Sequence, residues 1–428
     1  MFDAMQEKLA FLQLVKHREP MLLLTGQTIS GFGDGVALVA LTLLVLDTTH
    51  HSVSKLAWFA AARMIPTIIF LLVGGAVVDR FSRRLLLLIS DSMRAVLTGV
   101  LVLLLGLGVL RFWELLLFGV LFGTFDAVFM PAISAISPEI VPEDLLPAMN
   151  ALRPLSNNVL GNMIGPAVGG VLAAWSTTTA LGVDCATFVV SAVALFLMKP
   201  TPTPKLDVGA SMWEDIREGV HYVATTRWLW TTLVSVTALN AFVFMPMPVL
   251  IPYFLLHDLH TSKLVVGYSF AMFGFAGAIG ALVAGSLKMP RRRIRVMWIY
   301  WTISTFSALI IGVATNWWEV FLFPIISSPL MLLGNVIWET MMQREVPREL
   351  LGRATSVDWF VSLGVSPIGL VVAGVLSSHI GVRTYFVVMA LVTSLPGLYI
   401  LTSKRINAID RDRLSEAPTA EPEPVTNP

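Results

Sequence analysis

The sequence contains one cysteine and few charged residues. Cys185 is the single cysteine among 428 residues, which excludes a disulfide framework within the chain. Charged residues make up 13% of the chain and the net charge is +1, so there is no bulk attraction to nucleic acid. We find no phosphate-binding glycine loop, no serine-nucleophile elbow and no His/Cys cluster with metal-ligand spacing. We therefore expect neither an enzyme nor an ATP-driven pump, and no bound metal or cofactor.

Apolar residues are abundant instead. Hydrophobic residues make up 56% of the chain, and the mean hydropathy is +0.77. A soluble chain of this length has no interior large enough to bury so much apolar surface. Runs of about 20 apolar residues, the length that crosses a bilayer as a helix, recur throughout. We predict an all-α membrane protein with twelve transmembrane helices at roughly 20–47, 54–78, 84–108, 112–137, 150–174, 178–198, 228–256, 264–287, 294–314, 317–343, 352–378 and 384–402.

A polar, proline-containing segment separates the sixth and seventh predicted helices. It ends in a sequence typical of a surface helix, and we interpret it as a linker between two halves. The polar, proline-rich end of the chain has the composition of a disordered tail. The predicted units are a cytoplasmic segment (1–19), a six-helix half (20–199), a cytoplasmic linker (200–227), a second six-helix half (228–402) and the tail (403–428).

Lysine and arginine are distributed unequally between the two sides of the predicted membrane. The predicted inner loops and tails hold most of the 29 lysine and arginine residues, whereas the predicted outer loops hold only Lys55, Arg111, Lys263 and Arg383. Positive residues gather on the cytoplasmic side of membrane proteins. We therefore expect a monomeric, multi-pass protein of the plasma membrane with both termini in the cytoplasm.

The two predicted halves repeat each other. The segment 141–146 reads Val-Pro-Glu-Asp-Leu-Leu, and 346–351, which lies 205 residues later, reads Val-Pro-Arg-Glu-Leu-Leu. Each segment precedes the fifth helix of its half. Internal duplication of this kind is common in secondary transporters, whose substrate site lies between the repeats. The repeat predicts two pseudo-symmetric halves.

The fifth predicted helix contains small residues at regular intervals. Gly161, Gly165 and Gly169 recur every four positions and share one helix face, and Pro166 and Gly170 accompany them. Such a face lets a neighbouring backbone approach closely in a membrane, and proline favours a kink. We expect this helix to seal against the other half when a central cavity faces outward.

The loop after the second predicted helix carries charges. Gly75 precedes it, and Asp79 ends the helix, where an anion is disfavoured by the helix dipole. One interpretation is a gate latch, in which Asp79 pairs with a partner in only one arrangement of the halves. The alternative is ordinary anchoring on the cytoplasmic side by Arg80, Arg83 and Arg84.

These two motifs support a family resemblance. The loop 75–84 resembles the Gly-x-x-x-Asp-Arg-x-Gly-Arg-Arg motif of the major facilitator superfamily, with Ser82 in place of a glycine. The stretch 161–170 resembles the antiporter motif Gly-x-x-x-Gly-Pro-x-x-Gly-Gly, although an upstream glycine is replaced by Leu152. Over residues 20–402 the chain looks like a twelve-helix drug:proton antiporter, similar to macrolide and siderophore exporters.

The resemblance implies a major facilitator fold and a secondary transporter. It would export small amphipathic or hydrophobic molecules in exchange for protons by alternating access. The expected partners are therefore a small-molecule substrate, protons and the lipid bilayer. Two alternatives remain open at this point: a proton-coupled uptake symporter, and a membrane sensor or assembly component that transports nothing.

Charged residues inside the predicted helices are candidates for proton coupling, because they are costly in a membrane. Asp34 and Arg63 lie at similar depth, as either an exchangeable or a permanent ion pair. Asp126 is a second proton or cation site, or a packing partner for Asn157, Asn158 or Arg94. Glu339 and Asp358 suggest a cytoplasmic gate or proton exit, unless both reach water and loop arginines. We expect structural roles for Asp91, Arg94 and Asp184.

The lining of the cavity can be outlined from the helices that face it in the resembling family. Aromatic side chains and methionines on these helices suit bulky, variable, apolar substrates, because they offer adaptable contact. The same residue types are also expected on surfaces that face lipid. The candidates are Phe125, Met130, Asn157, Phe242, Met245, Trp338 and Trp359.

Overall fold

The computed structural model describes residues 13–78, 81–142, 145–200, 212–287 and 289–402. Asp79 and Arg80 of the predicted loop motif lie outside these ranges, as does the side chain of Met130. Within them the chain forms helices and no strand, which confirms the predicted all-α fold.

The N-terminal half is built from six membrane-length helical stretches. Its fifth stretch runs from Leu146 to Trp175 and includes a π-helical segment, η2. The elements in order are α2 (Arg18–Thr48), α3 (Val53–Val78), α4 (Arg83–Gly106), α5 (Phe112–Ile140), α6 (Leu146–Ser156), η2 (Asn157–Ile164), α7 (Gly165–Trp175) and α8 (Thr177–Leu197).

The C-terminal half follows the helix α9 (Met212–Thr225) and repeats the six-stretch plan. Its first, third, fourth and fifth stretches are each divided into consecutive short elements. These elements are α10 (Arg227–Leu239), η3 (Asn240–Phe244), α11 (Met247–Tyr253), η4 (Phe254–Asp258), α12 (Lys263–Ser286), α13 (Arg293–Phe306), α14 (Leu309–Val313), α15 (Trp317–Val320), α16 (Leu322–Glu345), α17 (Arg348–Gly364), α18 (Ser366–Ile380) and α19 (Val382–Thr402).

The helices match the membrane in length and composition. Eleven of the described helical stretches are long and apolar enough to cross a bilayer. The remaining one is α6–η2–α7, where Asn157, Asn158 and Asn162 interrupt the apolar sequence. Together they give the twelve transmembrane helices that the sequence predicts, in two halves of six. The protein is therefore a multi-pass membrane protein.

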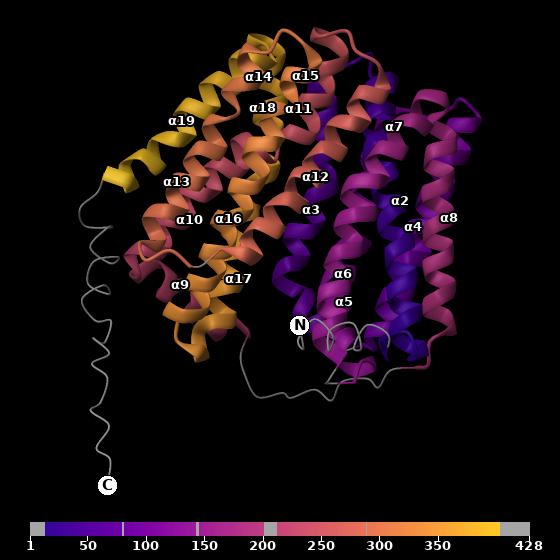
Figure 1. Cartoon of the computed structure of the whole chain (residues 1–428). Coiled ribbons are helices and arrows are strands. Elements are labelled where there is room, and N and C mark those ends of the chain that lie inside the picture. Colours follow the sequence, from indigo (N-terminus) through magenta and orange to yellow (C-terminus); the bar gives the residue numbers. More distant parts are fainter. Residues whose placement is uncertain (1–12, 79–80, 143–144, 201–211, 288, 403–428) are drawn as a thin grey trace, which may run out of the picture.

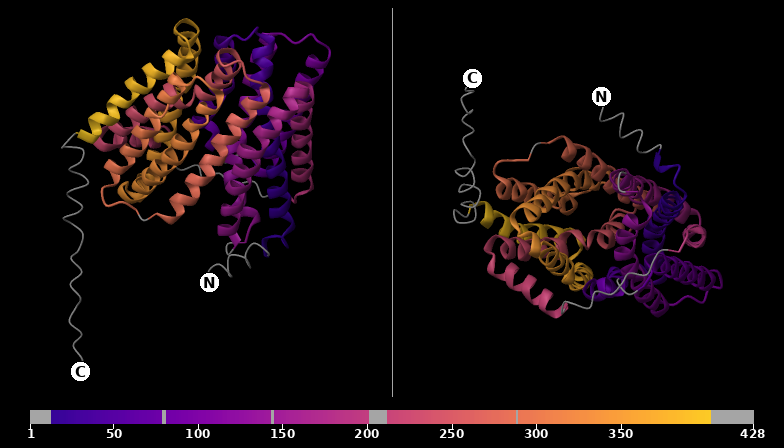
Figure 2. Two further views of the ribbon diagram at one scale, coloured as in Figure 1. Left: turned by 45° about the horizontal axis from the view of Figure 1, so that its top comes forward. Right: turned by 90° about the horizontal axis from the view of Figure 1, so that it is seen from below.

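The two halves meet near one end of the bundle. We name the end where α2 begins the terminal end and the end where α2 finishes the far end. Near the far end, α7 packs on α12 and α3 packs on α18. Figure 1 shows the N-terminal half in indigo to magenta beside the C-terminal half in rose to yellow, with the ribbons diverging toward the terminal end at the bottom. Figure 2 shows the same two groups of helices from below.

Polar contacts reinforce this meeting of the halves. The Ser54 hydroxyl of α3 donates to the Gly374 carbonyl of α18 over 3.0 Å. Lys263, which begins α12, forms a 2.6 Å ion pair with Asp47 near the end of α2. Both contacts lie near the far end, so the described structure holds the halves together there.

The helix α9 lies in the segment that the sequence marks as a linker. It packs on α17 of the C-terminal half, and Glu218 forms an ion pair with Arg353. Gly219 allows this contact, because a Cβ atom there would lie 3.0 Å from the Arg353 carbonyl oxygen.

Candidate functional site

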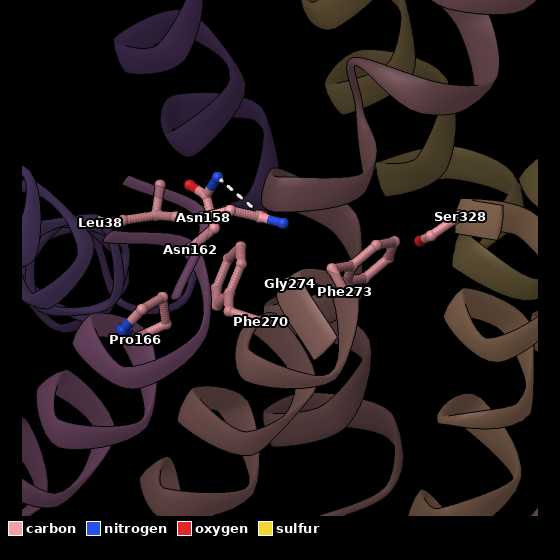
Figure 3. Close-up of a pocket in the computed structure, with 8 residues that line it drawn as sticks. All are labelled: Leu38, Asn158, Asn162, Pro166, Phe270, Phe273, Gly274 and Ser328. Atoms are coloured by element: carbon pink, nitrogen blue, oxygen red, sulfur yellow. Dashed lines mark hydrogen bonds between the residues drawn. The ribbon is translucent and has the colours of Figure 1, made fainter. Parts of the chain in front are cut away.

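A pocket lies between the two halves and takes its walls from both. Its volume is about 250 Å³. The N-terminal half contributes residues from α2, η2 and α7, and the C-terminal half contributes residues from α12 and α16. Figure 3 shows the two asparagine amides beside Phe270, and the Phe273 ring pointing toward Ser328. The lining residues are Leu38, Asn158, Asn162, Pro166, Phe270, Phe273, Gly274 and Ser328.

The pocket is mostly apolar, with a few polar groups in fixed positions. The Asn162 amide donates to the Asn158 side-chain oxygen over 3.4 Å (Figure 3). This hydrogen bond leaves further donor and acceptor positions on both amides, because each amide group carries two donors and two lone pairs. The pocket can therefore offer hydrogen bonds to a guest molecule as well as apolar contact.

The fifth helix presents two different faces. One face carries the pocket residues Asn158, Asn162 and Pro166, which recur every four positions. The π-helical turn η2 lies at this point, and π-helical turns are frequent at functional sites. Farther along, Gly170 meets the other half: its Cβ would lie 2.7 Å from the Cα of Gly267 in α12.

The neighbouring face carries the glycine series and packs within its own half. A Cβ atom on Gly165 would lie 2.7 Å from the Phe32 carbonyl oxygen, and one on Gly169 would lie 2.6 Å from that of Val36. Both carbonyls belong to α2. In this arrangement Gly161, Gly165 and Gly169 therefore face α2, whereas Gly170 faces α12. The sealing of the fifth helix against the other half when the cavity faces outward stays a prediction. The four-residue period identifies a close-packing face, but it does not say which helix approaches.

A group of buried charges occupies the interior of the N-terminal half. Arg94 of α4 is 1% exposed and forms a 2.5 Å ion pair with Asp91, one turn away. Asp126 of α5 lies 3.5 Å from the same guanidinium group. The Ser191 hydroxyl of α8 donates to Asp91 over 2.6 Å. Arg94 therefore ties three helices of the half together.

Aromatic rings surround the two arginines of this group. The Arg94 guanidinium lies 4.2 Å from the centre of the Phe129 ring and 4.8 Å from that of Phe188. The Arg63 guanidinium lies over the Phe122 ring at 4.6 Å. Such cation–π contacts stabilise a cation where water is absent.

Asp34 interacts with these charges and lies one helical turn from a pocket residue. It is half-buried on α2, and Leu38, one turn farther along on the same helix face, lines the pocket. Its charge interactions are with Arg94 first and with Arg63, Asp91 and Asp126 as well. It makes no hydrogen bond or ion pair that the described residues show, so the close Asp34–Arg63 pair suggested by their depth does not form in this arrangement.

The remaining charged candidates differ in their exposure and in their hydrogen bonds. Asp126 is 36% exposed, and its contact with Arg94 agrees with the packing alternative. Asp358 of α17 accepts hydrogen bonds from the Trp338 indole over 2.9 Å and from Ser362 over 3.2 Å. Glu339 of α16 is exposed, and its charge acts on Asp358. A cytoplasmic gate or proton exit formed by these two acids stays a prediction.

The described arginines of the loop motif bind within the N-terminal half. Arg83 forms an ion pair with Glu139 at the end of α5. Arg84 donates to the carbonyl groups of Leu195 and Phe196 at the end of α8, over 2.8 and 2.6 Å. Gly75 lies within α3. The latch itself depends on Asp79 and Arg80, which are outside the described residues.

The predicted cavity residues have varied positions. Trp338 is buried in the C-terminal half against Trp228 and Trp301, whereas Trp359 is 55% exposed. The side-chain oxygen of Asn157 packs against Gly31 of α2 and against Gly161 of the fifth helix. None of the described candidates is among the eight lining residues of this pocket; Phe125, Phe242 and Met245 are half-buried elsewhere.

Of the residues that line the pocket, sequence reasoning selected Pro166 as part of the glycine motif and missed the others as pocket residues. The signal for Asn158 and Asn162 was present, because polar side chains four positions apart are unusual in an apolar helix. Phe270 and Phe273 gave no such signal, since aromatic residues are equally expected on a lipid-facing surface.

Comparisons with known proteins agree with this architecture. A family model described as Major Facilitator Superfamily matches residues 23–357 and 233–424. The chain is 27% identical over 420 residues to the multidrug efflux pump Tap of Mycolicibacterium fortuitum, covering 92% of this chain and 98% of Tap. It is 21% identical over 371 residues to macrolide efflux protein A of Streptococcus pyogenes, covering 84% and 90% of the two chains.

The fold is also similar to that of a solved transporter. The crystal structure of the nucleoside transporter NupG superposes with a TM-score of 0.71 at 11% identity, over 90% of this chain and 100% of NupG. At this identity the likeness concerns the fold alone. The family match, the two-half architecture and the pocket between the halves together show that this chain belongs to the major facilitator superfamily and is a membrane transporter.

Proposed function

We propose that this transporter exports small amphipathic molecules from the cell in exchange for protons. The observation that carries the proposal is the position of Asp34, one helical turn from Leu38 of a pocket that both halves build. A proton site and a substrate site so close together on α2 give a physical means of coupling one to the other. The relatives named as multidrug and macrolide efflux proteins support the direction of transport.

The arrangement of the halves fits the start of an export cycle. The contacts of α7 with α12 and of α3 with α18 close the far end, while the ribbons diverge toward the terminal end (Figure 1). The excess of Lys and Arg at the terminal end supports a cytoplasmic position for that end. In this interpretation the pocket receives its substrate from the cytoplasm or the inner leaflet.

The pocket lining suggests the chemistry of the substrate. Leu38, Phe270 and Phe273 offer apolar and aromatic contact, and Asn158 and Asn162 offer neutral hydrogen bonds. No lining residue is charged. The best match is therefore a molecule with a large apolar body and a neutral hydrogen-bonding group.

The charges of the N-terminal half support proton coupling. Four carboxylates face two guanidinium groups: Asp34, Asp91, Asp126 and Asp184 against Arg63 and Arg94. With every carboxylate ionised the group would hold an excess of negative charge inside a membrane, which is costly. Bound protons remove that excess, and Asp34 is the member beside the pocket.

Transport in inside-out vesicles tests the proposal. A drug-sensitive host that expresses the chain is first screened against a panel of antibiotics and dyes. The compound with the largest gain in resistance is then used in vesicles with an imposed pH gradient. We expect accumulation when the lumen is acidic, and Asp34→Asn should lower the pH-driven rate at least about tenfold. Asp258→Asn is the matched control at the far end and should transport normally. If expression of the chain instead makes the host more sensitive to the compounds, and such a compound moves in the opposite direction in vesicles, the result would indicate uptake symport.

Two phenylalanines on α12 test the pocket. Phe270 lines the pocket and is 8% exposed, whereas Phe275 is 49% exposed and lines no part of it. We expect Phe270→Ala to change the order of resistance among compounds of different size, because it enlarges the pocket. Phe275→Ala should keep the order of the wild type. If both variants changed the order of resistance in the same way, the result would show that this pocket does not determine which compounds are recognised.

A further inference from the structure

Asp184 of α8 is a fully buried carboxylate whose environment differs from that of its neighbours. It is 1% exposed, and its Oδ1 atom makes no hydrogen bond with any described residue. Its nearest helix is α2: a Cβ atom on Gly33 would lie 2.9 Å from that same oxygen. Gly33 directly precedes Asp34 in the chain, so the absence of a side chain there brings Asp184 close to the backbone that carries Asp34.

Asp91 provides the contrast within the same half. It is 0% exposed, and it has both an ion pair with Arg94 and a hydrogen bond from Ser191. These partners compensate its charge. Among the residues that the structure describes, Asp184 has no comparable partner, although α8 packs on both α2 and α4. An ionised carboxylate that is buried without hydrogen bonds or a paired cation is strongly disfavoured.

The charged groups around Asp184 do not supply the missing compensation. Asp34 of α2 adds negative charge, and Arg63 and Arg94 provide the positive charge. Arg94 already serves Asp91 and Asp126, and Arg63 lies over the Phe122 ring. On α8 itself the neighbour is Cys185, whose thiol donates to the Ala95 carbonyl oxygen over 3.3 Å.

We propose that Asp184 is a second proton-binding site, which holds a proton in this arrangement of the halves and exchanges it with Asp34. One O–H bond forms on the Asp184 carboxylate as one O–H bond of the Asp34 carboxyl group breaks, and the negative charge passes to Asp34. No other reactant takes part. Asp34, beside the pocket, connects this buried site with the substrate.

The proposal rests on proton coupling but can be tested without transport. Infrared spectra of the purified protein at neutral pH report the carbonyl band of a protonated carboxylic acid. We expect the wild-type band to lose its intensity in Asp184→Asn. Asp91→Asn, an equally buried substitution on the adjacent helix, should keep it. A band of full intensity in Asp184→Asn would overturn the proposal.

Asp184→Glu provides a second variant that keeps a carboxyl group, in case the amide prevents folding. There we expect the band to remain at a shifted frequency, because the new carboxyl group has a different environment. A band that stays at the wild-type frequency in Asp184→Glu would assign it to another residue and overturn the proposal.

The experiments distinguish a failure of the proposed antiport from a failure of the second proton site. If the wild type moves no compound in response to a pH gradient but its band disappears in Asp184→Asn, the proton site stands and antiport fails. If pH-driven transport is present and the band persists in Asp184→Asn, antiport stands and the second proton site fails.

Discussion

The two halves of this transporter fill their interiors with different chemistry. The N-terminal half has a group of six charged residues within its helices, and Arg94 pairs with two of them. The C-terminal half has a chain of tryptophan rings in contact, running from Trp228 through Trp338 and Trp301 to Trp298. The pocket draws on both halves, but Asp34 and its charged neighbours lie in one. Duplicated halves can thus share a fold while the described residues of one concentrate buried charges and those of the other concentrate aromatic rings.

The largest expected effect is on the charged group. Arg94→Met should lower the free energy of unfolding by about 3–5 kcal/mol, because Asp91 loses its paired cation while remaining buried. Thermal unfolding of the purified protein measures the loss. Arg383→Met in the C-terminal half, where the arginine lies 5.2 Å from the Phe254 ring, should cost much less. Equal losses in the two variants would contradict the special role of charge in the N-terminal half.

The second effect concerns the place where the halves meet. Gly170→Val should reduce transport by about tenfold, equivalent to about 1.4 kcal/mol, because its side chain would force α7 away from Gly267 of α12. The rate in vesicles is compared at equal protein level in the membrane. Gly277→Val on α12 is the control, since a Cβ atom there meets nothing within 4 Å. Normal transport by the Gly170 variant would show that the far end need not close so tightly.

An effect of similar size is expected in the tryptophan chain. Trp301→Phe should destabilise the protein by about 1–2 kcal/mol, because the Asn335 side-chain oxygen loses its 3.2 Å hydrogen bond from the indole. Thermal unfolding again provides the measurement. Trp317→Phe, at a position that is 43% exposed, should have little effect. A change in the pH dependence of transport in the Trp301 variant would show that the C-terminal half takes part in proton coupling after all.

The smallest effect is expected for the ion pair near the far end. Asp47→Asn should cost less than about 1 kcal/mol, because both members of the Asp47–Lys263 pair are substantially exposed. The difference from wild type should shrink further in high salt, where exposed charges are screened. Lys263→Gln and the double variant complete the cycle. A larger loss that salt does not change would mean that this pair, rather than glycine packing, holds the halves together.

The sequence predicted the fold well because its physical signals are strong in a membrane protein. Long apolar runs give the helices, and the repeat at 141–146 and 346–351 gives the two halves. Depth along a helix also follows from counting residues, and by this count Glu339 and Asp358 lie at similar depth.

The partners of individual residues were harder to predict. In a bilayer the lipid and the protein interior are equally apolar, so hydrophobic pattern does not separate a buried face from an exposed one. Phe270 in the pocket and Phe275 outside it therefore look alike in the sequence. For the same reason the glycine series indicated close packing but not that its neighbour is α2, and Asp184 gave no indication of its missing hydrogen bond.

The two-faced fifth helix has a consequence for substrate affinity. Gly165 and Gly169 lock it to α2, so Asp34, Leu38 and both pocket asparagines belong to one rigid body. Phe270, Phe273 and Ser328 belong to the other body. In the proposed export cycle, a relative rotation of the two bodies would separate the amides from the aromatic wall, so the pocket would not have the same shape on both sides of the membrane. The same molecule must then bind with different strength when the pocket faces in and when it faces out, which favours capture on one side and release on the other.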